Sequence, residues 1–246
     1  MKILIHGSTG RMGKILCELL NTGYNGLELA AKVSPEEISD PANQVFTSLT
    51  AVDCDVDGVI DFSHHSAVGG LMDFCIAKNL PVVVATTGHT PEEKDIIAAA
   101  SKKIPVFFSA NMSIGVALLA ELAKKAASVF PEANIEIVEK HHNQKLDVPS
   151  GTALLLAHRI QEALTDTVLL VGRHENGKRT AKEIGIHSLR LGNEVGTHEI
   201  IIATGAETIT LKHEAENRSL FANGALAAAK FLEGKPAGLY SMQNII

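Results

Sequence analysis

Residues 2–13 read KILIHGSTGRMG, a short apolar strand that runs directly into a turn with three glycines. The glycines stand at positions 7, 10 and 13, and apolar residues then recur at helical spacing as far as Leu20. Because glycine has no Cβ, such a turn lets a pyrophosphate approach the N–H groups at a helix N-terminus. The spacing is G-x-x-G-x-x-G rather than the commoner G-x-G-x-x-G, so the prediction of a dinucleotide site depends on the strand and helix around the turn. A plain tight turn is the alternative interpretation.

Beyond this nucleotide turn (residues 7–13), the first 110 residues alternate β-rich runs with helical patterns. A capping box at Thr90 and Glu93 predicts a helix from Pro91. The remaining expected elements are helices over 12–20 and 67–79 and strands over 2–7, 27–33, 57–63, 81–88 and 104–110. The stretch 35–50 is polar, shows no clear periodicity and receives no element. The alternation predicts an α/β fold with a Rossmann-like doubly wound parallel sheet, in which ligands bind beyond the carboxyl ends of the strands.

The pattern changes near residue 113. The second half reads as a long helix, a strand, a helix that starts near Ser150, and three β-rich runs at 183–190, 197–204 and 207–215. These runs predict a mixed or antiparallel sheet in a second, α+β domain. A final Ala-rich helix over 219–234 is suited to pack back on the first domain. We therefore predict a dinucleotide-binding domain over 1–112, completed by 219–246, and a substrate-binding domain over 113–218.

The composition favours a folded protein that binds small molecules. The chain has 246 residues, of which 46% are hydrophobic and 20% charged, and its formal net charge is -6. Because the lysines and arginines are scattered, we expect no nucleic-acid partner. No run reaches the ~20 apolar residues of a membrane helix, and the first residues lead straight into a strand, so we expect a cytoplasmic protein without a membrane partner. Cys17, Cys54 and Cys75 lie far apart in the sequence and fit core thiols.

The end of the second expected strand bears on the choice of nucleotide. Dinucleotide sites often carry a carboxylate there, which binds the adenosine ribose and repels a 2′-phosphate. This chain has Ser34 and Pro35 instead. Lys32 or Ser34 could favour NADPH, whereas Glu36 and Glu37 follow closely enough to keep NADH open. The predicted cofactor is therefore NADPH or NADH.

Two later loops also follow expected strands. The first contains Ala85, Thr86 and Thr87, and the second runs from Ser109 to Met112. Each offers hydroxyl and backbone groups at a strand end, where a nicotinamide ribose would lie. Together they make a groove of cofactor size plausible.

Residues 139–153, EKHHNQKLDVPSGTA, form a second chemical signal, which we term the cationic segment. His141, His142 and Lys145 bring three groups that can carry positive charge or protons, and residues 150–152 begin a helix whose N–H groups suit an anion. The segment therefore predicts a small substrate with more than one carboxylate. Neither H-E-x-x-H nor a cysteine pattern accompanies the histidines, so we predict no metal. Ser150 lacks the G-x-S-x-G context of a nucleophile and reads as a helix cap.

The motifs G-x-x-G-R-M-G, A-T-T-G, S-A-N-x-S-x-G and H-H-x-x-K-x-D-x-P-S-G-T occur in this order. With these motifs, essentially the whole chain resembles the 4-hydroxy-tetrahydrodipicolinate reductase family, also called dihydrodipicolinate reductase, of the diaminopimelate route to lysine. The resemblance implies the NAD(P)H-dependent reduction of 4-hydroxy-tetrahydrodipicolinate to tetrahydrodipicolinate. It also implies a homotetramer assembled through the sheet of the second domain.

The resemblance further implies a role for each matching residue. His141 and Lys145 would be the proton-donating partners. The residues expected to contact the substrate are His142, Lys145, Ser150, Gly151 and Thr152. Those expected to bind the cofactor are Gly7, Ser8, Thr9, Gly10, Arg11, Met12, Ala85, Thr86, Thr87, Ser109, Ala110, Asn111 and Met112, with Ser34 added from the strand-end argument above.

The chain departs from the family pattern at several positions. The acid at the second strand end is missing, and His64 and His65 stand where an arginine commonly follows the D-F-S segment. Met112 replaces a frequent phenylalanine, and Val148 a usual alanine. Two other functions stay open: another dehydrogenase of the aspartate-derived pathway, and a regulator that senses NADPH without turnover. A sensor needs no proton donor, so the cationic segment makes the regulator the less favoured function. Since hydride transfer needs close contact, we also expect the two domains to close over their ligands.

Overall fold

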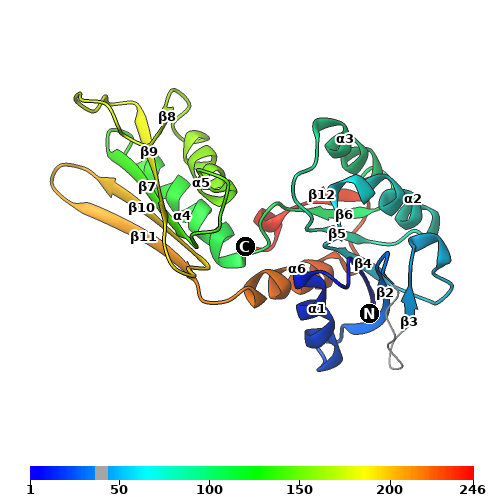
Figure 1. Cartoon of the computed structure of the whole chain (residues 1–246). Helices are drawn as coiled ribbons and strands as arrows, with labels where there is room; N and C mark the ends of the chain where they lie inside the picture. The colour runs from blue at the N-terminus through cyan, green and yellow to red at the C-terminus, as the bar shows by residue number, and fades with distance from the viewer. Residues whose placement is uncertain (37–43) are drawn as a thin grey trace. The chain divides into compact units, whose positions relative to one another are not determined.

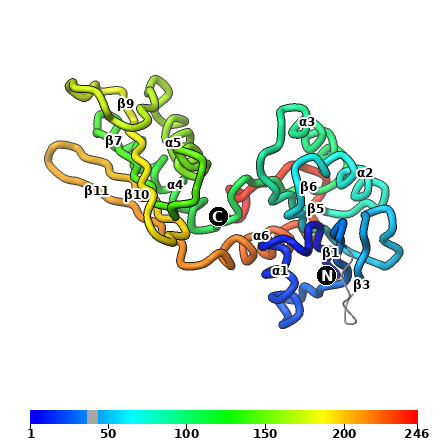
Figure 2. Tube along the Cα trace, in the orientation of Figure 1, coloured from blue at the N-terminus to red at the C-terminus, as the bar shows by residue number. Residues whose placement is uncertain are grey.

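The computed structural model describes residues 1–36 and 44–246, so Glu37 lies outside the described residues. The chain forms two compact units, one made of 1–113 and 219–246 and the other of 114–218. In the trace of Figure 2, the blue N-terminal and red C-terminal segments accordingly belong to the same unit. Each unit has its own sheet and its own core.

The sheet of the first unit has seven strands, all parallel, in the order β12-β6-β5-β4-β1-β2-β3. The strands are β1 (Lys2–His6), β2 (Glu28–Val33), β3 (Gln44–Phe46), β4 (Gly58–Asp61), β5 (Val82–Val84), β6 (Pro105–Phe108) and β12 (Gly238–Tyr240). Ile3, Leu4 and Ile5 of β1 are fully buried, as expected for a parallel strand covered on both faces. The prediction of a Rossmann-like sheet is confirmed.

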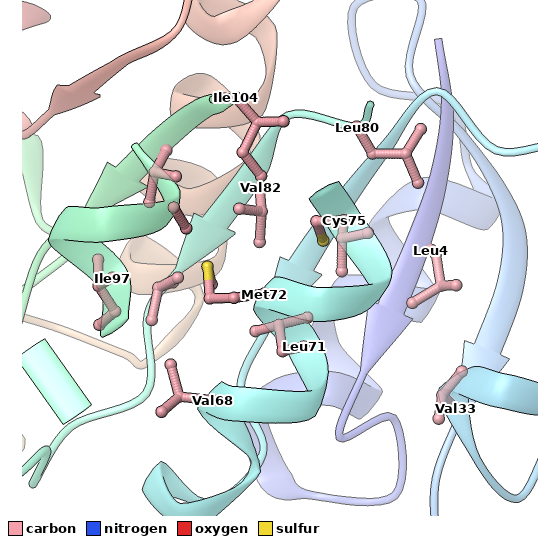
Figure 3. Close-up of a cluster of buried hydrophobic side chains, with 14 of the residues drawn as sticks. Leu4, Val33, Val68, Leu71, Met72, Cys75, Leu80, Val82, Ile97 and Ile104 are labelled. Atoms are coloured by element: carbon pink, nitrogen blue, oxygen red, sulfur yellow. The ribbon is translucent and has the colours of Figure 1, made fainter. Parts of the chain in front are cut away.

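Helices cover both faces of this sheet (Figure 1). They are α1 (Arg11–Asn21), α2 (Val68–Lys78), α3 (Pro91–Ala100) and α6 (Ser219–Leu232), with short 3₁₀ turns at Leu49–Ala51, His65–Ala67 and Met242–Asn244. Leu71, Met72 and Cys75 of α2 pack on Leu4 and Val82 of the sheet (Figure 3). On the other face, α1 and α6 contact each other, and α6 crosses β4, β5 and β6. The capping box at α3 forms as predicted.

The sequence patterns did not predict three short strands of the described structure. β3 lies within the stretch that received no element, and β12 and β8 (Val168–Val171) lie in segments without alternation. Strands of three or four residues are too short to show a period of two. β12 is held by pairing with β6, with Leu239 opposite Val106, so its existence depends on a contact distant in sequence.

The second unit is built on a five-stranded mixed sheet in the order β11-β10-β7-β9-β8. Its other elements are β7 (Asn134–His141), β9 (Glu183–Arg190), β10 (Gly196–Ala203), β11 (Thr208–Ala215), α4 (Ile114–Val129) and α5 (Gly151–Gln161). β7 pairs parallel to β9 and antiparallel to β10, which confirms the mixed sheet. One face carries isoleucines that pack against α4 and α5, among them Ile135, Ile137 and Ile200.

The cysteines are free thiols. Cys17 and Cys75 are buried and Cys54 is half-buried. Burial raises the pKa of the Cys75 thiol, as expected for an inert core residue. In the described part of the chain, no helix combines the length and apolar character needed to cross a membrane.

Candidate active site

The nucleotide turn requires glycine at two positions. Gly7 has φ +85°, and a Cβ there would lie 2.5 Å from the carbonyl oxygen of Phe62. A Cβ on Gly13 would lie 2.2 Å from the carbonyl oxygen of Gly7, because α1 starts directly against the turn. Among the described residues, no side chain caps α1 at Gly10. The first N–H groups of α1 are therefore suited to an anion.

A cavity of about 650 Å³ opens beside this turn, within the first unit. The turn residues Gly7, Thr9 and Gly10 line it, together with the ends of β2 and β4 and the segment Thr47–Thr50. This volume is typical of a small-molecule site. Of the other turn residues predicted to bind cofactor, Ser8 is buried and bonded to β2, and Arg11 is exposed on α1. Met12 is half-buried in the first turn of α1.

The two candidates for a 2′-phosphate contact lie in different places. Ser34 is at the edge of the large cavity, but the residue is fully buried and its hydroxyl lies 2.7 Å from that of Thr9. Lys32 lines a second cavity, of about 240 Å³, with Lys14 and Glu18. A phosphate held by Ser34 in the large cavity would therefore not meet Lys32 in the same cavity. Pro35 is exposed at the edge of the large cavity.

A buried carboxylate ties three strand ends of the first sheet together. Asp61, 2% exposed at the end of β4, accepts hydrogen bonds from Thr86 (2.6 Å), Ser63 (2.6 Å) and His6 (2.8 Å). Thr86, predicted to contact the cofactor, thus gives its hydroxyl to Asp61, while Thr87 beside it is exposed and Ala85 is buried. Sequence reasoning missed Asp61. A lone carboxylate that ends a buried apolar run was the signal.

The second predicted cofactor loop is braced by its own side chains. The Ser109 hydroxyl donates to the Asn111 carbonyl at 2.7 Å, and the Asn111 side-chain oxygen accepts the Ser113 N–H at 2.8 Å. Met112 is buried, and its carbonyl lies where a Cβ on Gly224 of α6 would be. Ala110 is exposed, so the loop presents backbone atoms at the strand end.

The paired histidines that depart from the family pattern lie on the first unit. His64 lines the large cavity, and its ring lies 4.2 Å from that of His65. His65 donates from Nδ1 to Glu93 at 2.9 Å, which ties it to α3. His64 is thus the member of the pair that lines the cavity beside the nucleotide turn.

Glu139 is the centre of the cationic segment. It is fully buried on β7 and accepts hydrogen bonds from His141, from the N–H of Ser150 (3.2 Å) and from both terminal nitrogens of Arg190 (3.0 and 2.9 Å). Burial alone would raise the pKa of Glu139, but the hydrogen bonds from His141 and Arg190 outweigh burial and hold that pKa well below its ordinary value. No sequence pattern assigned roles to Glu139 and Arg190, although Glu139 shares the buried face of β7 with Ile137 and His141.

Lys145 and His142 lie beyond the end of β7. The Lys145 ammonium is 2.8 Å from Asp147, and the backbone N–H of Lys145 donates to the His142 carbonyl. Partial burial alone would raise the pKa of Asp147, whereas the hydrogen bond from Lys145 lowers it. His142 and Lys145 are half-buried, so both side chains remain accessible to a ligand from solvent.

The helix start at Ser150 forms as predicted, but its polar groups are largely used inside the unit. Ser150 is 1% exposed, its N–H donates to Glu139, and its hydroxyl accepts the Ala153 N–H at 3.1 Å. The hydroxyl also lies 3.2 Å from Nε2 of His198 on β10. Gly151 is exposed and Thr152 half-buried. Ser150 is therefore committed to contacts inside the unit, and residues 151 and 152 are the more exposed part of the helix start.

Glu139, His141 and His198 place ligand-type atoms within 4.8 Å of one another, as a metal site would. The Arg190 guanidinium, however, already bonds both oxygens of Glu139 and supplies positive charge there. A metal ion at this carboxylate would displace that pair and meet a like charge. The arrangement fits a charge-paired histidine better, and the absence of a metal remains a prediction.

His198 predicts a loss of stability in acid. Burial, aided by the nearby charge of His141, lowers the pKa of His198 to about 3, while an unfolded histidine titrates near ~6.5. The unfolded chain therefore takes up the proton first, and the free energy of unfolding falls as the pH drops from ~6.5 towards the folded pKa. Between about pH 7.5 and pH 5 this site contributes a loss of about 2 kcal/mol.

Urea unfolding at these two pH values tests the contribution of His198. The proteins compared are wild type, His198→Gln and His158→Gln. The decrease in the free energy of unfolding between the higher and the lower pH should be smaller in His198→Gln than in wild type. His158 is exposed on α5, so His158→Gln should behave as wild type. An equal pH dependence in all three proteins would contradict the assignment.

Known proteins resemble this chain along its whole length. The family model described as the N-terminus of dihydrodipicolinate reductase matches residues 1–112, and that of the C-terminus matches residues 115–246. The 4-hydroxy-tetrahydrodipicolinate reductase of Clostridium novyi (strain NT) is 43% identical over 247 residues, covering 100% of this chain and 98% of that protein. The enzyme of that name from Caldanaerobacter subterraneus subsp. tengcongensis is also 43% identical, with 100% and 98% covered. The dipicolinate-bound dihydrodipicolinate reductase from Paenisporosarcina sp. TG-14 superposes with a TM-score of 0.84, at 27% identity and with 100% and 99% covered.

Proposed function

The chain belongs to the dihydrodipicolinate reductase family, and on that premise we propose which of its residues perform each part of the reaction. The protein is an oxidoreductase that reduces 4-hydroxy-tetrahydrodipicolinate to tetrahydrodipicolinate with a nicotinamide nucleotide. The product lacks the 4-hydroxyl group of the substrate, which leaves as water. The reaction also consumes one hydride and one proton. The bound nucleotide supplies the hydride. The protein must bind the nucleotide and the substrate, orient them and supply the proton.

The observation that carries the residue assignment is the hydrogen bonding of the cationic segment. His141 is held by a buried carboxylate, while Lys145 lies four residues further on with its ammonium near solvent. We assign proton donation to these two side chains. His142, Lys145 and the helix start at 150–152 would bind the two carboxylates of the substrate, since cations and oriented N–H groups recognise carboxylates.

The first unit would hold the nucleotide. The glycine turn and the N-terminus of α1 are suited to the pyrophosphate, and the adjoining cavity has the volume for the adenosine half. The loops at 85–87 and 109–112 would lie on the nicotinamide side. We also propose that the second unit binds the substrate and assembles a homotetramer through its sheet, and that the enzyme works in the cytoplasm.

The experiment that tests this function is a steady-state assay with freshly generated substrate and either NADH or NADPH. Among the residues that line the described cavity, neither an aspartate or glutamate nor a lysine or arginine adjoins Ser34 at the end of β2. Both nucleotides should therefore be oxidised, with kcat/KM values within about 10-fold of each other. Aspartate and homoserine serve as control substrates for the related dehydrogenases. Turnover of a control substrate alone, or nucleotide binding without turnover, would contradict the proposal.

Nucleotide choice should respond to a carboxylate placed at the cavity edge. Pro35→Asp puts a negative charge where a 2′-phosphate would lie, so it should weaken NADPH binding by about 10-fold through repulsion. NADH affinity should change little. Calorimetric titration of wild type and variant with both nucleotides measures the ratio. An unchanged ratio would mean that the adenosine ribose lies elsewhere.

A further inference from the structure

Three of the described residues, His141, Ser150 and Arg190, donate hydrogen bonds to the Glu139 carboxylate. One oxygen receives the Ser150 N–H and one Arg190 nitrogen, and the other receives His141 Nδ1 and the second Arg190 nitrogen. A carboxylate satisfies all of these bonds because it only accepts. A neutral amide in its place would turn an NH₂ group towards two donors, whichever way it was flipped.

Arg190 is itself fixed on both sides. Besides the fork to Glu139, its two terminal nitrogens donate to the carbonyls of Leu189 (2.8 Å) and Asp147 (2.7 Å). The second bond joins β9 to the loop that carries Lys145. Such a two-pronged arginine–carboxylate pair is geometrically specific and holds the carboxylate in one orientation.

This pair determines the state of the His141 ring. Because the Glu139 carboxylate has no proton to give, the bond to Nδ1 requires a proton on Nδ1. The other nitrogen, Nε2, points towards Gly196 on β10, where a Cβ would lie 3.0 Å away. Glycine at this position leaves space beside Nε2, and its backbone does not adopt a left-handed conformation that would require glycine on its own.

We propose that Glu139, clamped by Arg190, is a positioning residue that fixes His141 with its proton on Nδ1 and presents Nε2, beside Gly196, as the atom that exchanges the reaction proton with the substrate. This proposal rests on the proposed function for the role of His141. Glu139 itself need not touch the substrate, since it acts through the histidine ring. The same carboxylate also holds the N-terminus of α5 through Ser150, so it links the ring to the carboxylate-binding helix start.

The state of His141 can be measured without substrate. Protein labelled with ¹⁵N-histidine gives the protonation of each ring nitrogen by long-range ¹H–¹⁵N correlation, and His141→Gln identifies the signal. In wild type, Nδ1 should carry a proton at every pH at which the protein is folded, including alkaline pH. In Glu139→Gln this preference should be lost, whereas Glu199→Gln, a carboxylate of β10 paired with Lys140, should keep it. A wild-type ring with an unprotonated Nδ1 would overturn the proposal.

Kinetics tests the role of Nε2. Glu139→Gln should lower kcat by about 10- to 100-fold with little change in the Kd for NADH, and Glu199→Gln should stay near wild type. If Glu139→Gln does not fold, Gly196→Ala provides the test, because this variant keeps Glu139 and places a methyl group against Nε2 of His141. Its kcat should fall at least ~10-fold, because small displacements of a reacting group are costly, with Nδ1 still protonated. A wild-type kcat in Gly196→Ala would overturn the assignment of Nε2. A wild-type protein without turnover would instead contradict the proposed function and leave the nitrogen measurement valid.

Discussion

Lys145→Ala is expected to lower kcat at least ~100-fold, the range typical for loss of a general acid. The ammonium is partly accessible and lies 2.8 Å from Asp147. Its removal takes away the proposed proton donor and the proposed partner of a substrate carboxylate. The affinity for a pyridine dicarboxylate should therefore fall as well, while NADH binding, which we assign to the other unit, should survive. Stopped-flow turnover and calorimetry measure these quantities.

Lys182→Ala is a matched control for this variant. Lys182 also pairs with an aspartate, Asp166, in the second unit, and it lies outside the cationic segment. Its loss should leave kcat and diacid affinity near wild type. If Lys145→Ala reduces the substrate at the wild-type rate, Lys145 is not a proton donor. If diacid affinity is unchanged, Lys145 does not grip a carboxylate.

Gly13→Ala is expected to raise the Kd for NADH and NADPH about 100-fold. The new Cβ would lie 2.2 Å from the Gly7 carbonyl oxygen and 2.7 Å from Cα of Ser8, so the turn and α1 must separate. Separation moves the N–H groups of the turn away from the proposed position of the pyrophosphate. The loss of about two charge-assisted hydrogen bonds is of this order. Overpacking should also lower the free energy of unfolding by about 1–3 kcal/mol.

Gly69→Ala is the control for this second variant. Gly69 lies in α2, and a Cβ there would meet no atom within 4 Å. Because alanine favours helices over glycine, this change should add about 0.5–1 kcal/mol of stability without altering nucleotide affinity. Calorimetric titration and thermal unfolding of both variants separate the two effects. Unchanged nucleotide affinity in Gly13→Ala would exclude the turn as the pyrophosphate site.

Local signals in the sequence predicted most of the fold. The strand and glycine turn at 2–13 predicted β1 and the start of α1, and the capping box at Thr90 predicted α3, because each depends on neighbours in the chain. β3, β8 and β12 were missed because such short strands exist through pairing with distant strands. The family resemblance supplied the function, and the family models and relatives confirm it.

Of the contacts within the candidate site, the sequence could predict only those between residues close together in the chain. The sequence brought His141 and Lys145 together because they lie within one short segment. It could not bring Arg190 or His198 to them, since these residues come from β9 and β10 and meet β7 only in the folded sheet. The sequence also could not show that the N–H of Ser150 is taken by Glu139. The roles of the individual residues remain predictions.

The most direct test of the account is the transfer of label from the nucleotide to the product. Freshly generated 4-hydroxy-tetrahydrodipicolinate is reduced in ordinary water with NADH or NADPH that carries deuterium at the transferred position, and the product is analysed by mass spectrometry. We expect wild type to form tetrahydrodipicolinate with one deuterium per oxidised nucleotide, and Lys145→Ala to form almost none. Oxidation of the nucleotide without labelled tetrahydrodipicolinate, or no oxidation with this substrate, would contradict it.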